Sequence, residues 1–146
     1  MEAETPESPS VLQILLVDDS RSTRENALEL LDPRQYQIQV AENGFEALCK
    51  LVAEPPDIVF MDSTMPELDG FASCALITAS LQYAHIPVVI MSANDSPLER
   101  ARAALAGAQR VISKPFRKRD LLDALETLVP SLDPTEEAAH AHCVDH

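Results

Sequence analysis

The chain lacks the features that mark membrane and exported proteins. Its 146 residues include no apolar run near the roughly 20 residues that a membrane-spanning helix requires. The N-terminus shows no charged segment followed by an apolar stretch and a small-residue cleavage site, so nothing in it predicts export. We therefore expect a cytoplasmic protein without membrane insertion, with enough chain for one domain and one hydrophobic core.

Cysteine is also scarce. Cys49, Cys74 and Cys143 do not have the spacing of a metal or redox site, and an odd number in a cytoplasmic chain predicts free thiols. Cys49 and Cys74 fall within helical patterns, where we expect them to act as packing groups.

Basic residues are few. Eleven Lys and Arg against 24 Asp and Glu give a formal net charge of −13. A negative surface repels phosphate, which argues against nucleic acid and anionic lipid as general partners. Seven of the eleven basic residues lie between Arg100 and Arg119, where no acidic residue occurs. Charge alone leaves two interpretations of this stretch open, an interaction face and a solvated basic surface.

What the chain does contain is a regular alternation of strand and helix patterns. Apolar or alternating runs predict strands at 11–17, 36–41, 57–61, 86–91 and 109–113. Helical periodicity predicts helices at 21–31, 43–52, 71–81, 96–106 and 117–129. Strands that alternate with helices imply crossover connections, and hence a doubly wound α/β domain over 11–130 with one five-stranded parallel sheet covered on both faces.

Local signals mark several helix ends. The predicted N-caps are Ser20, Asn43 with Glu46 as its capping acid, and Ser96 with Pro97 and Glu99, while Gly107 predicts a left-handed C-cap. The acidic residues 1–10 predict a disordered tail, and 131–146 a flexible one. We expect no output module after residue 130, because so few residues cannot supply one. The C-terminal tract with His140, His142, Cys143 and His146 is of a kind that can bind Zn²⁺ or Ni²⁺, but no predicted scaffold orders it.

Polar side chains stand where the predicted strands end. Asp18 and Asp19 follow the first strand, Asp62 the third, Ser92 the fourth and Lys114 the fifth. In open parallel sheets, ligands bind outside the carboxyl ends of the strands, so these side chains should meet in one crevice. Three carboxylates repel one another at short range unless a cation lies between them. Oxygen ligands favour hard ions, which predicts Mg²⁺ or Mn²⁺.

Each of these residues also has an ordinary structural explanation. Either Asp18 or Asp19 would suit the positive end of a helix, and Asp62 would suit a turn. Lys114 alone could be a surface lysine, and Ser92 a hydroxyl that satisfies the backbone. Their joint occurrence at four strand ends is what favours a functional site.

Four segments, in order, resemble the signatures of a known family. "LLVDDS", "MDSTMPELDG", "VVIMSA" and "ISKPF" are similar to the motifs of two-component response-regulator receiver domains, over roughly residues 11 to 130. The chain further resembles stand-alone receivers of chemotaxis type, in particular PilG-like regulators of type IV pilus twitching motility; "CALI" with a long third helix contributes to this likeness. The resemblance implies a flavodoxin-like (βα)5 fold.

The resemblance also implies roles for the crevice residues. Asp62 matches the aspartate that accepts a phosphoryl group from the phosphohistidine of a kinase. Asp19 would bind Mg²⁺ directly and Asp18 through water, with Asp62 and the backbone carbonyl of Thr64 completing the ligands. Lys114 and the hydroxyl of Ser92 would contact phosphoryl oxygens. The family further implies a cis peptide bond between Lys114 and Pro115, and a phosphoacceptor rather than a turnover enzyme.

The resemblance leaves the output open. Phosphorylation would repack the fourth helix, fifth strand and fifth helix for a downstream partner, and we expect Arg110, Arg117, Lys118 and Arg119 to form a partner face that docks an acidic segment. Val111 stands where the family usually has an aromatic switch residue, which favours the alternative of a phosphate sink or scaffold without its own activated output. A phosphohydrolase is disfavoured, since Thr64 stands where that class would place a second carboxylate.

Overall fold

Five parallel strands form the centre of the protein, whose computed structural model describes residues 11–94 and 96–129. The elements are β1 (Leu12–Val17), α1 (Arg21–Leu30), β2 (Tyr36–Ala41), α2 (Gly44–Ala53), β3 (Ile58–Asp62), α3 (Gly70–Ala79), β4 (Val88–Ser92), α4 (Pro97–Ala106), β5 (Arg110–Ser113) and α5 (Lys118–Leu128). The strand order is β2-β1-β3-β4-β5, and every neighbouring pair is parallel. The predicted doubly wound sheet is confirmed.

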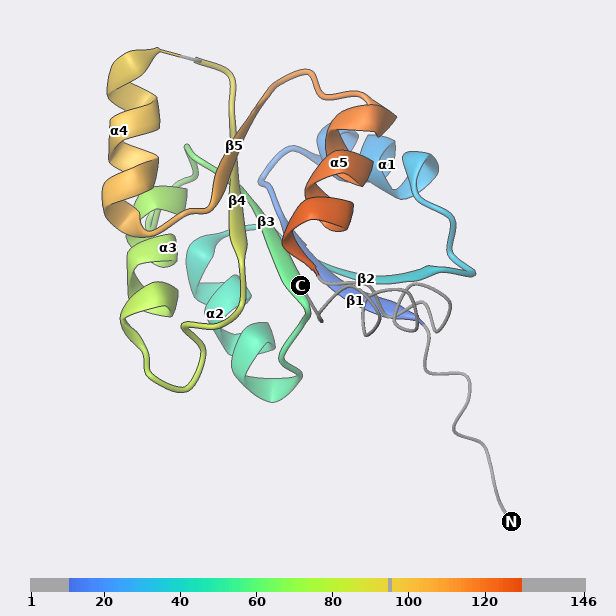
Figure 1. Ribbon diagram of the computed structural model, residues 1–146, viewed down its shortest axis with the longest axis horizontal. Helices are drawn as coiled ribbons and strands as arrows, with labels where there is room; N and C mark the ends of the chain where they lie inside the picture. Colours follow the sequence, from blue (N-terminus) through green and yellow to red (C-terminus); the bar gives the residue numbers. More distant parts are fainter. Residues whose placement is uncertain (1–10, 95, 130–146) are drawn as a thin grey trace, which may run out of the picture.

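Helices cover both faces of this sheet, with α1 and α5 on one and α2, α3 and α4 on the other (Figure 1). Leu15 and Val17 of β1 point into the core under α2, α3 and α4, whereas Ile14 and Leu16 point into the core under α1 and α5. Burial on both faces explains why the central strands read as continuous apolar runs.

The predicted caps lie at the ends of their helices. Ser20 Oγ accepts the N–H of Thr23 at 3.4 Å, and Asn43 Oδ1 accepts the N–H of Glu46 at 2.8 Å. Ser96 caps α4 in the same way, with Pro97 at the first helical position. Gly107 ends α4 with φ of 96°, in the left-handed region that glycine adopts without strain.

Two predicted details of α3 and α2 were wrong. α3 ends at Ala79 and not at residue 81, so it is no longer than its neighbours. A separate turn begins there, because the carbonyl of Ser80 accepts the N–H groups of Tyr83 and Ala84 at 3.1 and 2.8 Å. Cys49 on α2 is exposed, and is therefore not a packing group.

Cys74 on α3 is buried, as predicted. Its Sγ lies 3.5 Å from the carbonyl oxygen of Ala106 at the end of α4, so it packs where the two helices meet. Burial raises the pKa of this thiol to about 11.

α5 begins on a basic residue. Arg117 occupies the N-cap position, and a guanidinium cannot accept a hydrogen bond from the helix. The carboxylate of Asp120, three residues on, accepts the N–H of Arg117 at 2.8 Å. Asp120 also places a negative charge in the first turn, which relieves part of the conflict between the basic residues and the helix dipole.

The tails predicted for 1–10 and 131–146, with the histidine tract, lie outside the described residues. Within those residues, no helix has both the length and the apolar character needed to cross a membrane.

Candidate functional site

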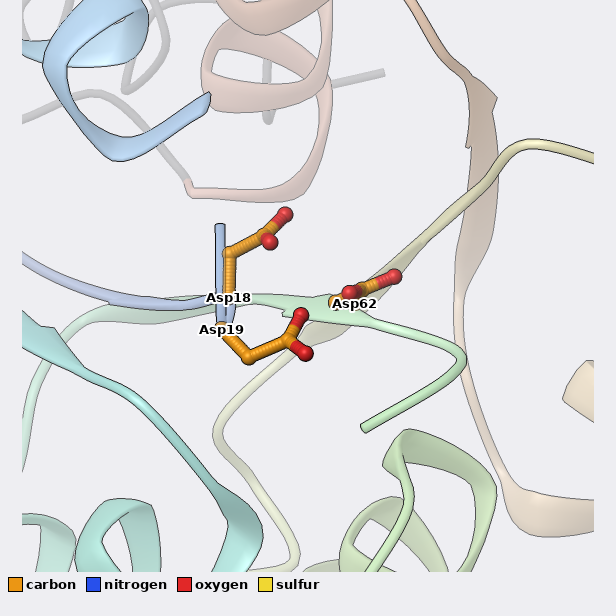
Figure 2. A group of neighbouring side chains, drawn as sticks. All are labelled: Asp18, Asp19 and Asp62. Carbon is orange, nitrogen blue, oxygen red and sulfur yellow. The ribbon is translucent and has the colours of Figure 1, made fainter. Parts of the chain in front are cut away.

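The three predicted carboxylates meet at the carboxyl ends of β1 and β3. These strands are neighbours, and because β2 lies on the other side of β1, the chain order of the sheet reverses between β1 and β3. Figure 2 shows Asp18 and Asp19 projecting from the end of β1, beside Asp62 at the end of β3. One carboxylate oxygen from each lies within 4.8 Å of the others. Asp18 and Asp62 are buried, whereas Asp19 is exposed.

Lys114 is the cation that the structure places against these carboxylates. Its Nζ lies 2.8 Å from Asp18 Oδ2 and 3.1 Å from Asp62 Oδ1. The backbone N–H of Lys114 donates to the carbonyl of Ser92 at 2.9 Å, which ties the end of β5 to the end of β4. The peptide bond to Pro115 is cis, as predicted.

Burial and charge shift the acidity of two groups in the cluster. Burial, followed by repulsion from Asp18, raises the pKa of Asp62 to about 6, although Lys114 opposes this shift. Burial alone would lower the pKa of Lys114, but its contacts with Asp18 and Asp62 outweigh it and raise that pKa. At neutral pH, Asp62 is therefore mostly ionised and Lys114 is charged.

Arg24 on α1 contacts the residue that follows β1, a role that was not predicted from the sequence. Its guanidinium donates to the backbone carbonyl of Asp18 at 2.6 Å and lies 3.7 Å from the carboxylate of Glu42. Asp18 Oδ1 in turn accepts the N–H of Ser20 at 2.8 Å. These contacts fix Asp18 in place, and a single basic residue near the start of a helix carries no sequence signal of such a role.

Gly70 brings the start of α3 against the backbone at the end of β3. A Cβ at this position would lie 2.0 Å from the backbone oxygen of Asp62, closer than any real contact. Only glycine therefore allows α3 to pack this closely against the end of β3. The sequence places Gly70 before the helix but does not reveal this approach.

The donor set suits a hard divalent cation. Three carboxylates and one ammonium leave two formal negative charges uncompensated in a partly buried cluster. Asp18 Oδ2 is buried and, within the described residues, makes no aligned hydrogen bond besides its ion pair with Lys114. Carboxylate oxygens of this kind are the ligands that Mg²⁺ and Mn²⁺ prefer.

The predicted Thr64 and Ser92 lie beside this cluster. Asp62 Oδ1 accepts the N–H of Thr64 at 3.3 Å. The hydroxyl of Ser92 is directed elsewhere, since it lies 2.8 Å from the carbonyl of Asn94 and 3.3 Å from Glu99 Oε1. Sequence reasoning assigned Glu99 only to the cap of α4 and missed this contact.

The predicted partner face is less uniformly basic than the sequence indicates. Arg110 and Arg117 line a groove beside β5 and α5 of about 460 Å³, but Asp120 and Asp123 line it too. Arg117 Nε lies 3.9 Å from Asp120 Oδ2. Lys118 and Arg119 are exposed at the start of α5.

The model of the response regulator receiver domain family matches residues 14–126. The chain belongs to the response regulator receiver family. The match begins within β1 and ends within α5, so it takes in every strand and helix at least in part.

Two curated receiver proteins illustrate the range of relatives. Protein PilG of Pseudomonas aeruginosa is 35% identical over 125 residues, which cover 86% of this chain and 93% of PilG. Response regulator MprA of Mycobacterium avium is 32% identical over 127 residues. The chain spans 55% of the length of MprA, so that relative extends well beyond the shared receiver.

Solved receiver structures share the fold. Chemotaxis protein CheY4 of Vibrio cholerae superimposes with a TM-score of 0.76 at 29% identity, covering 81% of this chain and 98% of CheY4. The receiver domain of a signal transduction histidine kinase from Syntrophus aciditrophicus gives a TM-score of 0.76 at 29% identity, covering 85% and 94% of the two chains.

Proposed function

We propose that this protein is a single-domain response regulator that accepts a phosphoryl group on Asp62 from a histidine kinase of chemotaxis type. The observation that carries the proposal is the position of Asp62, at a strand end between Lys114 and the acidic pair Asp18 and Asp19. An aspartyl nucleophile beside a fixed cation and a metal-binding group is the arrangement that phosphoryl transfer needs.

The chemistry falls to the carboxylate of Asp62. One of its oxygens attacks the phosphorus of the kinase phosphohistidine, so that a P–O bond forms while the P–N bond breaks and its electron pair returns to the imidazole. Lys114, 3.1 Å from Asp62, stabilises negative charge on the transferring oxygens. The hydroxyl of Ser92 donates to another phosphoryl oxygen once it turns away from its present partners.

Asp18, Asp19, Asp62 and the carbonyl of Thr64 would hold the divalent cation. Mg²⁺, or Mn²⁺ in its place, supplies positive charge that offsets the charge of the phosphoryl oxygens and of the carboxylates. Asp18 is buried and fixed by Ser20 and Arg24, whereas Asp19 is exposed beside Asp62. Asp19 would bind the cation directly, and Asp18 would act mainly through water.

Intact mass tests the phosphoacceptor. The wild type and Asp62→Asn are mixed with acetyl phosphate and Mg²⁺, and a phosphoryl adduct that decays on standing is expected on the wild type alone. Asp57→Asn, at the far end of β3, is the matched control and should form the adduct. An equal adduct on Asp62→Asn would assign the phosphoryl group to another residue.

The pathway follows from similarity to PilG. Because the shared region covers nearly all of PilG, we infer control of type IV pili by a chemotaxis-like kinase in the cytoplasm. The output face is formed by α4, β5 and α5, and its Lys118 and Arg119 attract an acidic segment of the partner. Loss of twitching motility on deletion of the gene, restored by the wild type but not by Asp62→Asn, is the expected result.

A phosphate sink is the second candidate, and Val111 is the observation that favours it. Val111 on β5 is partly buried and carries no ring that could rotate inward on phosphorylation. A sink would accept phosphoryl groups at Asp62 without any change in affinity for a downstream protein. Partner binding that strengthens on phosphorylation would exclude it.

A further inference from the structure

The hydroxyl of Ser92 has a partner that the receiver resemblance does not supply. In this structure it lies between the carbonyl of Asn94, at 2.8 Å, and Oε1 of Glu99 on α4, at 3.3 Å. A serine hydroxyl has one proton to donate. While that proton serves either acceptor, Ser92 has none for a phosphoryl oxygen on Asp62.

Loss of this contact would be unfavourable for Glu99. Its side chain is 15% exposed, and a partly buried carboxylate that loses a hydrogen-bond donor costs stability. Its other oxygen, Oε2, lies 3.5 Å from the guanidinium of Arg102, one turn further along α4. When Ser92 turns away, Arg102 is the side-chain partner that the Glu99 carboxylate keeps within the described residues.

Arg102 extends these contacts from α4 to α3. Its guanidinium lies 4.3 Å from the centre of the Phe71 ring and 4.0 Å from Asp69 Oδ2. Asp69 caps α3 by accepting the N–H of Ala72 at 2.8 Å, and it directly precedes Gly70. The series of contacts therefore returns to the loop that follows the phosphoacceptor.

We propose that Glu99 is a positioning residue that holds Ser92 away from Asp62 in the resting protein, and that release of Ser92 passes through Glu99 and Arg102 to the α3–α4 pair. The inference rests on the proposed function, because phosphorylation of Asp62 is what draws Ser92 away. It provides a route for the signal that needs no aromatic residue at Val111.

The resting contact is tested without any phosphodonor. Urea unfolding of the wild type, Ser92→Ala, Glu99→Ala and the double variant forms a double-mutant cycle. We expect the coupling between the two residues to change the unfolding equilibrium constant by about threefold to tenfold. Ser92→Thr keeps the hydroxyl and should keep most of the coupling, while Glu99→Asp is too short and should lose it. Additive effects in the cycle would overturn the contact.

The restraint on signalling is tested with beryllium fluoride and Mg²⁺, which mimic a phosphoryl group on a carboxylate. Glu99→Ala removes one of the two acceptors that hold the Ser92 hydroxyl and leaves only the carbonyl of Asn94, so its apparent affinity for beryllium fluoride should be about threefold to tenfold tighter than that of the wild type. Glu126→Ala, an exposed change on α5, is the control and should match the wild type. Equal or weaker binding by Glu99→Ala would overturn the restraint.

Transmission to α3 is read from backbone amide shifts in the same titration. Beryllium fluoride should shift the amides of 69–72 and 94 in the wild type, and Arg102→Gln should lose at least half of the shift at 69–72 while keeping that at 94. An unchanged response in Arg102→Gln would overturn the route. If the wild type shows no Asp62-dependent binding, the proposed function fails and the signalling role with it, whereas the cycle decides the resting contact independently.

Discussion

Asp62 combines a buried position with a neighbouring negative charge. It is 5% exposed and its pKa is raised to about 6, first by burial and then by Asp18. Its folded pKa therefore lies above the ordinary value of 3.8 that it has in an unfolded chain. The protonated form of Asp62 therefore favours the folded state. This contribution to the free energy of unfolding is fully present below pH 3.8 and is lost as the pH rises through about 6. The ionised phosphoacceptor thus destabilises the resting protein at neutral pH.

Asp62→Asn should consequently stabilise the protein at neutral pH. In urea unfolding with a chelator present, we expect a gain of at most about 3 kcal/mol near pH 7.5 that shrinks to about 1 kcal/mol near pH 4.5. Mg²⁺ should narrow the difference, because a bound cation offsets the charge in the wild type. A gain that is the same at both pH values would contradict the assignment of the raised pKa to this group.

Asp18 and Asp19 should differ although they are adjacent. Asp19→Ala removes the proposed direct ligand from an exposed position, so it should weaken Mg²⁺ binding more than Asp18→Ala while changing stability by no more than about 0.5 kcal/mol. Asp18→Ala also leaves the N–H of Ser20 without its acceptor and Lys114 with one carboxylate fewer. It should cost about 1–3 kcal/mol in stability. A Mg²⁺ titration with equal affinities would contradict the roles.

The sequence predicted which residues form the cluster, but not the side-chain contacts around them. Residues at the ends of parallel strands meet whatever lies between them in sequence, which is why Asp18, Asp62 and Lys114 were found together. The contact of Glu99 with Ser92 depends instead on the rotamer of one side chain, and Glu99 already had a sufficient explanation at the N-terminus of α4. The sequence predicted a metal ion beside Asp18, which the cluster of three carboxylates suits, and the structure adds Lys114 as a second positive charge there.

Among the helices, α3 begins at a glycine and α4 ends at one, and the two glycines have different structural roles. Gly70 opens α3 against the backbone of Asp62, where a Cβ would lie 2.0 Å from the carbonyl oxygen. Gly107 closes α4 at φ of 96°, and a Cβ there would lie 2.6 Å from Thr78 Oγ1. The first restricts the functional site, while the second restricts only the packing of α4 on α3.

The two alanine variants should therefore separate stability from function. Gly107→Ala should cost about 1–2 kcal/mol through its backbone conformation and leave the Mg²⁺ affinity unchanged. Gly70→Ala must move the end of β3 or the start of α3, so it should lose stability and also bind Mg²⁺ several-fold more weakly. Thermal unfolding with and without Mg²⁺ compares them, and an unaffected Mg²⁺ shift in Gly70→Ala would contradict the close approach.

Element positions followed from the sequence where a chemical signal marks them. Ser20, Asn43, Ser96 and Gly107 all lie at the ends they predicted, because capping depends on residues within one turn. The end of α3 was placed two residues late, since Ser80 and Leu81 continue the apolar pattern without a breaker. The helix ends at its C-cap Ser80, whose N–H donates to the carbonyl of Ile77, and the turn to Tyr83 and Ala84 follows it.

The molecule as a whole carries a formal net charge of −13, and its basic residues are distributed unevenly along the chain. Of the seven in the basic stretch, Lys114 belongs to the acidic cluster and Arg102 to the α3–α4 contact. Arg117 lies beside Asp120. Lys118 and Arg119 are consequently the residues best placed to attract an acidic partner from solution.

Exchange of Lys118 and Arg119 for glutamine should slow association with the kinase and reduce its salt dependence. Attraction between opposed surfaces acts mainly on the association rate and is screened beyond about 8 Å at physiological salt. Arg117→Gln should have a smaller effect, and all three variants should keep acetyl phosphate reactivity. Stopped-flow binding at two salt concentrations is the measurement, and unchanged rates would identify these residues as a solvated surface.

The reactivity of Cys74 can report when the junction of α3 and α4 opens. Its thiol is buried against Ala106 and stays protonated because its pKa is about 11, so thiol reagents can modify it only when the two helices separate. Cys49 is exposed and should react at once. In a Cys143→Ser variant, the slow phase of thiol modification therefore measures how often this junction opens, and beryllium fluoride should change that rate if phosphorylation loosens or tightens the helix pair.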